Sequence, residues 1–165
     1  MASNRVTPVI LAVSGVKNSG KTTLIERLLP LLSEKGIRTA VIKHDGHRFT
    51  SDTPGTDSFR FFNAGACGSA VFDAEKFTVS RRATVTEAEL SVFFPDADLI
   101  LLEGFKDSVY PTIELVRARV SEKPVCNPSS CIALVSDLAL VTVLPLFAPD
   151  AYGEIAGFIG GLYQY

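Results

Sequence analysis

The sequence predicts a three-layer α/β fold, in which a mostly parallel β-sheet has helices on both faces and a β-hairpin extension. Short, almost wholly apolar runs recur along the chain, as expected for strands buried on both faces of a sheet. Amphipathic segments separate several of these runs, which is typical of helices that connect parallel strands. With 165 residues, the chain suits a single domain over residues 1–165 with one core.

The first strand, loop and helix follow one another within residues 9–36. Residues 9–13 are apolar and partly β-branched, which predicts a buried strand. The sequence GVKNSGKTTL follows at residues 15–24, and leucines at helical spacing come after it. We expect this helix to end near Gly36, because glycine is favoured just past helix ends. Pro30 lies inside the helix and predicts a kink or a local break.

The loop matches G-x-x-x-x-G-K-[ST] at every fixed position, and this motif binds phosphate chains. Glycines permit backbone angles and close approach that a Cβ would block, and the loop N–H groups form an anion nest. The helix start adds its positive dipole end. Lys21 is expected to contact the β- and γ-phosphates, and the Thr22 hydroxyl to bind Mg²⁺. The predicted nucleotide-binding residues are Gly15, Val16, Lys17, Asn18, Ser19, Gly20, Lys21, Thr22 and Thr23.

The remaining elements follow from apolar runs, caps and turns. They are a strand at 39–43, a helix from Thr56 to about Ala64, a hairpin of strands 69–72 and 77–80, a short helix capped by Thr86, strands at 98–104, 112–116, 131–135 and 140–143, and a helix near 150–162.

Two strands end in carboxylates that are candidates for metal binding. Glu103 ends the strand at 98–104, where it would hold Mg²⁺ through water; the alternative is a structural salt bridge. Asp45 follows the strand at 39–43 and would face the γ-phosphate and the metal. His44 and His47 flank Asp45, so this segment is either a transition-metal site or a polar loop beside the phosphates. The predicted metal ligands are Thr22, Asp45 and Glu103.

Asp137 follows the strand at 131–135 and is the candidate for base recognition. A carboxylate accepts both N1–H and N2–H₂ of guanine, which adenine does not offer, so one buried aspartate can discriminate between the bases. The alternative is an aspartate that only caps a turn.

The composition limits the partners and the compartment. A net charge of −2 predicts no broad attraction to nucleic acid or to a membrane surface. Three cysteines without a secretory signal predict reduced thiols and a cytoplasmic protein. The pair Cys126 and Cys131 is either half of a metal site or two buried thiols.

Taken in order, several segments resemble the molybdopterin-guanine dinucleotide biosynthesis adaptor (MobB) family. These segments are Gly15 to Leu24, Lys43-His44, Pro54-Gly55-Thr56-Asp57-Ser58-x-Arg60, Ala64-Gly65-Ala66 and Leu101-Leu102-Glu103-Gly104-Phe105-Lys106. The resemblance extends from about Val9 to Ile159. It implies a P-loop NTPase fold, binding of GTP and Mg²⁺, weak GTPase activity and a homodimer. It also implies a partner, the guanylyltransferase that joins GMP to molybdopterin, with the hairpin as a candidate dimer element.

The sequence contains no evident water-activating base and no clearly placed arginine finger, which fits slow hydrolysis. Lys21 and Asp45 are the candidate catalytic residues, and Arg60 and Lys17 are candidates to complete the charge compensation. One alternative is a small-molecule kinase with Arg81 and Arg82 in a lid. Another is a metal-delivering GTPase that uses the two histidines and the cysteines. A purely structural module would leave the phosphate loop unexplained.

Overall fold

The computed structural model describes residues 7–45 and 52–162. By their contacts, these residues form two compact units. The first unit contains the described residues up to His44 and from Glu87 onward, and the second runs from Asp45 to Thr86. That the chain is one domain over residues 1–165 stays a prediction.

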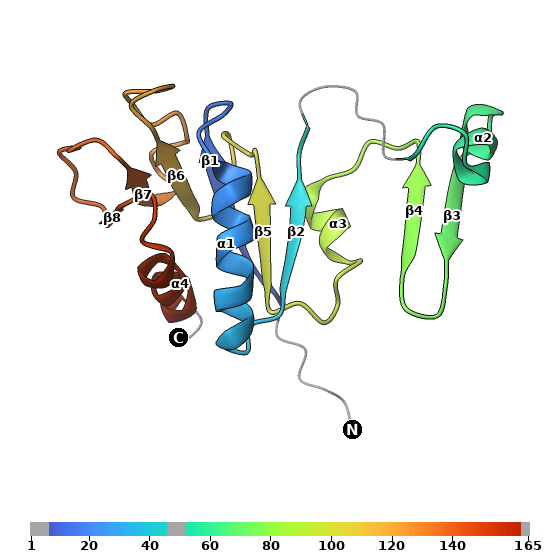
Figure 1. The fold of residues 1–165 in the computed structure, drawn as a ribbon, viewed down its shortest axis with the longest axis horizontal. Coiled ribbons are helices and arrows are strands. Elements are labelled where there is room, and N and C mark those ends of the chain that lie inside the picture. Colours follow the sequence, from blue (N-terminus) through green and yellow to red (C-terminus); the bar gives the residue numbers. More distant parts are fainter. Residues whose placement is uncertain (1–6, 46–51, 163–165) are drawn as a thin grey trace. The chain divides into compact units, whose positions relative to one another are not determined.

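A six-stranded sheet in the order β2-β5-β1-β6-β7-β8 forms the centre of the first unit, and its strand pairs are parallel. The strands are β1 (Val9–Gly15), β2 (Thr39–Lys43), β5 (Leu99–Glu103), β6 (Thr112–Val116), β7 (Cys131–Ser136) and β8 (Leu146–Phe147). Because the strands are parallel, their carboxyl ends meet at one edge, the upper edge in Figure 1. The predicted parallel sheet is confirmed, and this edge is where ligands bind in such sheets.

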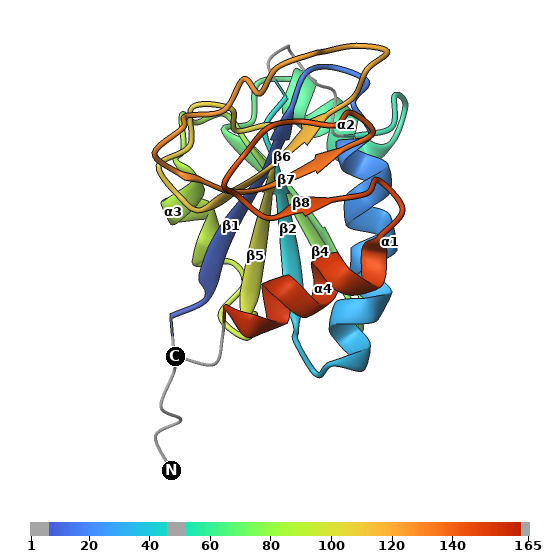
Figure 2. The same cartoon turned by 90° about the vertical axis from the view of Figure 1, so that its left-hand side faces the viewer.

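Helices cover both faces of this sheet, as Figure 2 shows. Helices α1 (Lys21–Glu34) and α4 (Tyr152–Gly161) pack on one face through buried side chains such as Leu28 and Ile155. On the other face, the short helix α3 (Glu87–Ser91) contributes Leu90 to a smaller apolar cluster. The three predicted layers are therefore confirmed.

Strand β1 shows why the sequence is apolar at successive positions. Leu11 and Val13 belong to the cluster under α1 and α4, whereas Ala12 belongs to the opposite cluster. All three are completely buried. Because side chains alternate between the two faces, a strand covered on both sides is apolar throughout. A polar residue at the carboxyl end of such a strand is therefore a signal of function.

Helix α1 starts directly after the glycine-rich loop and ends in a glycine cap, as predicted. Gly36 has φ 77°, its N–H donates to Ser33 O at 2.9 Å, and the Ile37 N–H donates to Leu32 O at 3.0 Å. The helix is continuous from Lys21 to Glu34, so a local break near Glu26 to Pro30 is a wrong prediction. Pro30 is exposed, while buried leucines on either side of it, Leu28 and Leu32, anchor the helix to the sheet.

The second unit consists of one helix and one hairpin. Helix α2 (Asp57–Asn63) begins at Thr56, whose Oγ1 accepts from the Phe59 N–H. Strands β3 (Gly68–Phe72) and β4 (Phe77–Arg81) pair antiparallel, which confirms the predicted hairpin. Asp73 Oδ1 holds the turn by accepting from two backbone N–H groups, at 2.8 and 2.9 Å. The hairpin forms a two-stranded sheet of its own and is not an edge of the six-stranded sheet.

The strand predicted at residues 140–143 does not form. This segment is irregular, and Val141 and Val143 are fully exposed, so their β-branched composition is misleading. Local hydrogen bonds shape it instead: Leu138 N–H donates to Ser136 Oγ and Leu144 N–H to Thr142 Oγ1, both at 3.0 Å. The last strand is the two-residue β8. None of the helices in the described part of the chain is long and apolar enough to span a membrane.

Candidate functional site

The loop between β1 and α1 lies at the carboxyl edge of the sheet, and its backbone requires glycine at its first position. Gly15 has φ 143°, and a Cβ there would lie 2.6 Å from Ser19 Oγ and 2.8 Å from Leu115 O. Gly20 has φ 97° and open space around it, so it is needed for its backbone angle alone. Asn18 has φ 64°, a conformation that asparagine tolerates better than most residues.

Lys21 curls back over this loop. Its Nζ donates to the backbone oxygens of Gly15 and Val16, both at 2.9 Å. Burial lowers the pKa of the Lys21 ammonium from its ordinary value, against the raising effect of Glu103 and Glu114. The ammonium therefore lies at the mouth of the loop, where a phosphate chain would need a cation.

Two buried hydroxyls belong to the same strand and loop. Ser14 Oγ and Ser19 Oγ have no hydrogen-bond partner among the described residues. Buried polar atoms without a partner are rare in folded proteins and call for an explanation. Ser19 belongs to the loop and lies beside Gly15, where an anion would supply the missing partner, whereas Ser14 belongs to β1.

Thr22 and Glu103 form the second part of the site. Thr22 Oγ1 donates to Glu103 Oε1 at 2.8 Å, and Lys43 Nζ approaches the same oxygen at 3.1 Å. Glu103 is buried at the end of β5. A hydroxyl and a carboxylate are the hard oxygen ligands that Mg²⁺ prefers, so these two residues fit the predicted metal. Glu103 also forms an ion pair with Lys43, which is the structural salt bridge expected under the alternative interpretation of this residue.

Asp98, at the opposite end of β5, has a different role. It accepts three hydrogen bonds from Arg38, two from the guanidinium at 3.0 and 2.8 Å and one from the backbone N–H at 2.9 Å. The Arg38 guanidinium lowers the pKa of Asp98 to about 2. Asp98 therefore ties the start of β5 to the start of β2, away from the carboxyl edge.

The other predicted metal ligand, Asp45, is exposed and is the first residue of the second unit. Its role at the metal stays a prediction. The His44 ring lies 5.4 Å from the Phe105 ring, and His47 is outside the described residues. Within residues 7–45 and 52–162, no three His, Cys, Asp or Glu side chains are grouped so as to hold a metal ion.

The cysteines are free thiols in the described chain. Cys126 is buried and Cys131 is half-buried, and burial raises the pKa of both thiols. Among the described residues, neither thiol belongs to a group of three potential metal ligands, which favours the interpretation as buried thiols.

Asp137 directly follows β7 and holds the segment after β6. Its Oδ1 accepts from the Ala118 N–H at 2.8 Å and its Oδ2 from Arg117 Nε at 3.1 Å. The Ala118 N–H, more than the Arg117 guanidinium, keeps the pKa of Asp137 below its ordinary value. These contacts match the turn-capping alternative. Each carboxylate oxygen has a second lone pair, so base recognition stays a prediction.

The structure adds two cations that sequence reasoning did not assign. Arg119 Nη2 donates to Asn18 O at 3.1 Å, which links the segment after β6 to the phosphate loop. Lys43 pairs with Glu103 as described above. Lys43 and Arg119 each lie at or just beyond the carboxyl end of a strand that neighbours β1 or β5. That position could have identified them as candidates, but only once the order of the strands in the sheet is known.

Comparisons with known proteins point to a single family. The family model of molybdopterin guanine dinucleotide synthesis protein B matches residues 10–137. The molybdopterin-guanine dinucleotide biosynthesis adapter protein of Escherichia coli is 34% identical over 168 residues, covering 96% of this chain and 95% of that protein. The adapter protein of Haemophilus influenzae is 34% identical over 157 residues, and the match covers 91% of this chain and 86% of that protein. The crystal structure of Bacillus subtilis MobB matches with a TM-score of 0.77 and 30% sequence identity, and the match covers 93% of this chain and 96% of that one.

Proposed function

The chain belongs to the molybdopterin guanine dinucleotide synthesis protein B family, and on this premise we propose that it is a GTP-binding adapter that assists the guanylylation of molybdopterin. The observation that carries the proposal is the phosphate loop with Lys21 over its backbone and Thr22 bonded to Glu103. The loop, the Lys21 ammonium and the proposed metal ligands Thr22 and Glu103 lie at the carboxyl edge of a parallel sheet, which supports nucleotide binding there.

In this proposal, the loop N–H groups of residues 15–23 and the Lys21 ammonium bind the phosphates. Binding moves Lys21 Nζ from the backbone oxygens of Gly15 and Val16 to the phosphate oxygens, which replaces two neutral acceptors by charged ones. Thr22 and Glu103, with Asp45 as a further candidate, hold Mg²⁺. When bound, Mg²⁺ would supply positive charge that offsets the negative charge of the phosphates.

Asp137 recognises guanine in this proposal, and its fixed position supports the role. The Ala118 N–H and the Arg117 guanidinium orient its carboxylate, so little ordering remains to be done when the base binds. Arg119 joins the same segment to the phosphate loop at Asn18 O. One segment, residues 117–119, thus connects the proposed base contact to the phosphate contacts.

We propose that hydrolysis is weak. Glu103, a buried carboxylate at the loop, is bonded to Thr22 and is a proposed Mg²⁺ ligand, which leaves it poorly placed to activate water. Lys21 and Asp45 remain the candidate catalytic residues. Binding of GTP, more than its turnover, is the step expected to serve the adapter role.

The proposed partners are the molybdopterin guanylyltransferase and a second copy of this chain, both in the cytoplasm. The hairpin supports a homodimer: the side chains of Phe72 and Phe77 are 81% and 64% exposed, and none of the described residues of the second unit is buried. A two-stranded hairpin is only marginally stable by itself, so partner contacts would supply the missing burial.

The small-molecule kinase alternative has less support. It requires arginines free to close over a substrate. Arg82 is instead engaged within its own unit, where Nη2 donates to Phe62 O at 2.9 Å and the guanidinium lies 4.2 Å from the Phe62 ring centroid.

Calorimetric titration with GTP and with ATP, each with Mg²⁺, tests the proposal on the wild type and on Asp137→Ala. We expect GTP to bind, ATP to bind at least tenfold more weakly, and Asp137→Ala to lose this preference. Lys21→Ala is the control that should abolish binding of both nucleotides. Equal or tighter binding of ATP by the wild type would overturn guanine selectivity and favour the kinase.

A further inference from the structure

Lys43 and Glu103 are the last residues of two neighbouring strands, β2 and β5, and are direct register partners. In a parallel pair this register places both side chains on the same face of the sheet. Lys43 Nζ lies 3.1 Å from Glu103 Oε1. The Glu103 side chain is 9% exposed, whereas the Lys43 side chain is 55% exposed. The carboxylate is thus fixed, and the ammonium sits on a flexible stem at the surface.

Glu103 Oε1 is shared between two donors. It accepts from Thr22 Oγ1, at the start of the helix after the phosphate loop, as well as from Lys43. Thr22, Lys43 and the buried Glu103 carboxylate therefore form a single hydrogen-bonded cluster at the proposed phosphate site.

A bound metal ion would change which negative group in this cluster attracts the Lys43 ammonium. Glu103 and Thr22 would hold a divalent cation, and the Lys43 ammonium would then be repelled from the same oxygen, because like charges at contact distance are unfavourable. A polyphosphate brings negative charge to the same place. The ammonium has a flexible four-carbon stem with three donors, so it can follow the negative charge.

We propose that Lys43 is a second phosphate-positioning residue: it neutralises Glu103 when no nucleotide is bound, and it moves to the terminal phosphate when nucleotide and Mg²⁺ bind. The inference rests on the proposed nucleotide binding at the loop. Its consequence is selectivity for the triphosphate, because only the triphosphate carries the γ-phosphate next to the metal ligands. Lys21 and the loop N–H groups, in contrast, also serve the diphosphate.

The test is calorimetry on Lys43→Met, which removes the ammonium and keeps most of the stem. We expect the affinity for GTP with Mg²⁺ to fall about tenfold or more, as for a lost hydrogen bond to a charged group. The affinity for GDP should change less than about twofold, the size of a minor surface effect. Lys43→Arg keeps a cation with phosphate-binding geometry and should retain most of the preference for GTP.

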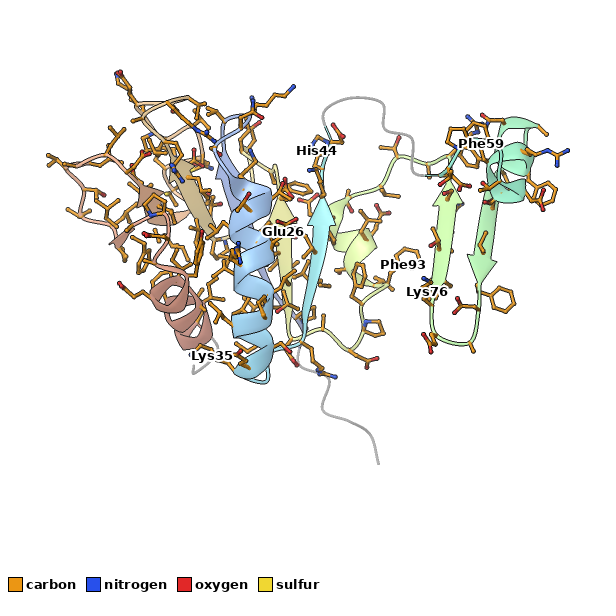
Figure 3. All side chains as sticks on the ribbon, viewed as in Figure 1. Glu26, Lys35, His44, Phe59, Lys76 and Phe93 are labelled. Atoms are coloured by element: carbon orange, nitrogen blue, oxygen red, sulfur yellow. The ribbon has the colours of Figure 1, made fainter. Side chains whose placement is uncertain are left out.

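The matched control is Lys35→Met, the same substitution at the opposite end of the sheet. Figure 3 labels Lys35 near the lower end of α1 and His44, the residue after Lys43, near the upper end of β2. This control should leave both affinities unchanged. Thermal unfolding of each variant without ligand shows whether the fold persists, and if Lys43→Met does not fold, the triphosphate preference of Lys43→Arg and of Lys43→Gln takes its place.

Equal losses for GTP and GDP would overturn the inference, since a lysine that only balances Glu103 affects both nucleotides alike. An unchanged GTP affinity would overturn it as well. If the wild type binds ATP in place of GTP, only the assignment of the base fails. The ratio of the ATP affinity to the ADP affinity then measures the effect of Lys43 on triphosphate selectivity. If the wild type binds no nucleotide, the proposed function and this inference fail together.

Discussion

Thr22 and Glu103 are 81 positions apart in the chain, yet Thr22 Oγ1 donates to Glu103 Oε1 at 2.8 Å. The contact exists because β1 and β5 are parallel neighbours, with Val13 and Glu103 as register partners. The helix that follows the phosphate loop therefore starts beside the end of β5. A hydroxyl and a buried carboxylate are held together there, which would reduce the ordering that the proposed Mg²⁺ site requires.

Glu103→Gln tests the metal role of this pair. The amide keeps the shape and can still accept from Thr22, but it loses the charge that a divalent cation needs. We expect the gain in GTP affinity that Mg²⁺ provides to shrink by about tenfold or more, while binding without Mg²⁺ stays within about threefold of wild type. Titrations with Mg²⁺ and with a chelator measure both. A full Mg²⁺ effect in the variant would remove Glu103 from the metal site.

Gly15→Ala should prevent formation of the phosphate loop. The added Cβ would meet Ser19 Oγ at 2.6 Å and Leu115 O at 2.8 Å, in a backbone conformation that alanine rarely adopts. Strain of this kind costs on the order of 1–3 kcal/mol. We expect a loss of that size in the free energy of unfolding, measured in urea, and no measurable GTP binding.

Gly36→Ala is the control for this substitution. Gly36 also has a positive φ of 77°, but a Cβ added there would meet open space, with no neighbouring atom within 4 Å. The substitution should cost about 1–2 kcal/mol of stability through its backbone angle alone and leave GTP affinity unchanged. Loss of GTP binding in both variants would point to general unfolding and not to the loop.

Arg119→Ala should loosen the link between the segment after β6 and the phosphate loop. The guanidinium bonds to Asn18 O at 3.1 Å. If the full net contribution of about 0.5–1.5 kcal/mol is lost from binding, GTP affinity falls by roughly twofold to 13-fold. Lys123→Ala is the matched control, since it removes an exposed positive charge from the same connection between β6 and β7. Equal losses in the two variants would indicate long-range attraction without a specific role for Arg119.

Asp98→Asn should change the acid sensitivity of the fold. Arg38 lowers the Asp98 pKa from its ordinary value of 3.8 to about 2. A carboxyl whose pKa is depressed by folding stabilises the native state above the unfolded pKa, and this contribution is lost as the pH falls toward the folded pKa. Between about pH 4 and pH 2, wild-type stability should therefore fall more steeply than that of Asp98→Asn.

Urea unfolding at several pH values across this range measures the effect, with the exposed Asp107→Asn as the control. GTP affinity should not change in Asp98→Asn, because this residue lies at the amino end of β5. Parallel pH curves for the wild type and Asp98→Asn would show that the Arg38 contact is not maintained in solution.

Phe72→Asp tests the proposed homodimer. This side chain is 81% exposed in the single chain, and its cross-strand partner in the hairpin is Phe77. The substitution therefore removes little packing within the chain and should change the free energy of unfolding of the monomer by no more than about 1 kcal/mol. If the hairpin is the dimer contact, the charge should raise the dissociation constant at least tenfold, as measured by sedimentation or light scattering. Val143→Asp, fully exposed in the first unit, is the control. If the dimer persists with an unchanged dissociation constant in Phe72→Asp, the exposed tip of the hairpin is not the dimer contact.

Local patterns in the sequence were sufficient for the strand, glycine loop and helix at residues 9–36, for the hairpin, and for Glu103 as a strand-end carboxylate. These features depend on neighbours in the chain: apolar alternation, glycine angles, caps and turns. The same reasoning failed at residues 140–143, where an apolar, β-branched segment is exposed and irregular. Composition shows that a segment has strand propensity, but whether a neighbouring strand is present to pair with it and bury it depends on the tertiary fold.

The tertiary structure alone decided which charges meet. Lys43 reaches Glu103, Arg119 reaches Asn18 O, and Asp137 holds the Ala118 N–H across separations of 60, 101 and 19 residues. Each contact depends on the order β2-β5-β1-β6-β7 and on the register of the pairs. A shift of one residue turns a side chain to the other face of the sheet. The sequence therefore determined the chemistry available to this protein, and strand order and register determined which of its groups act together.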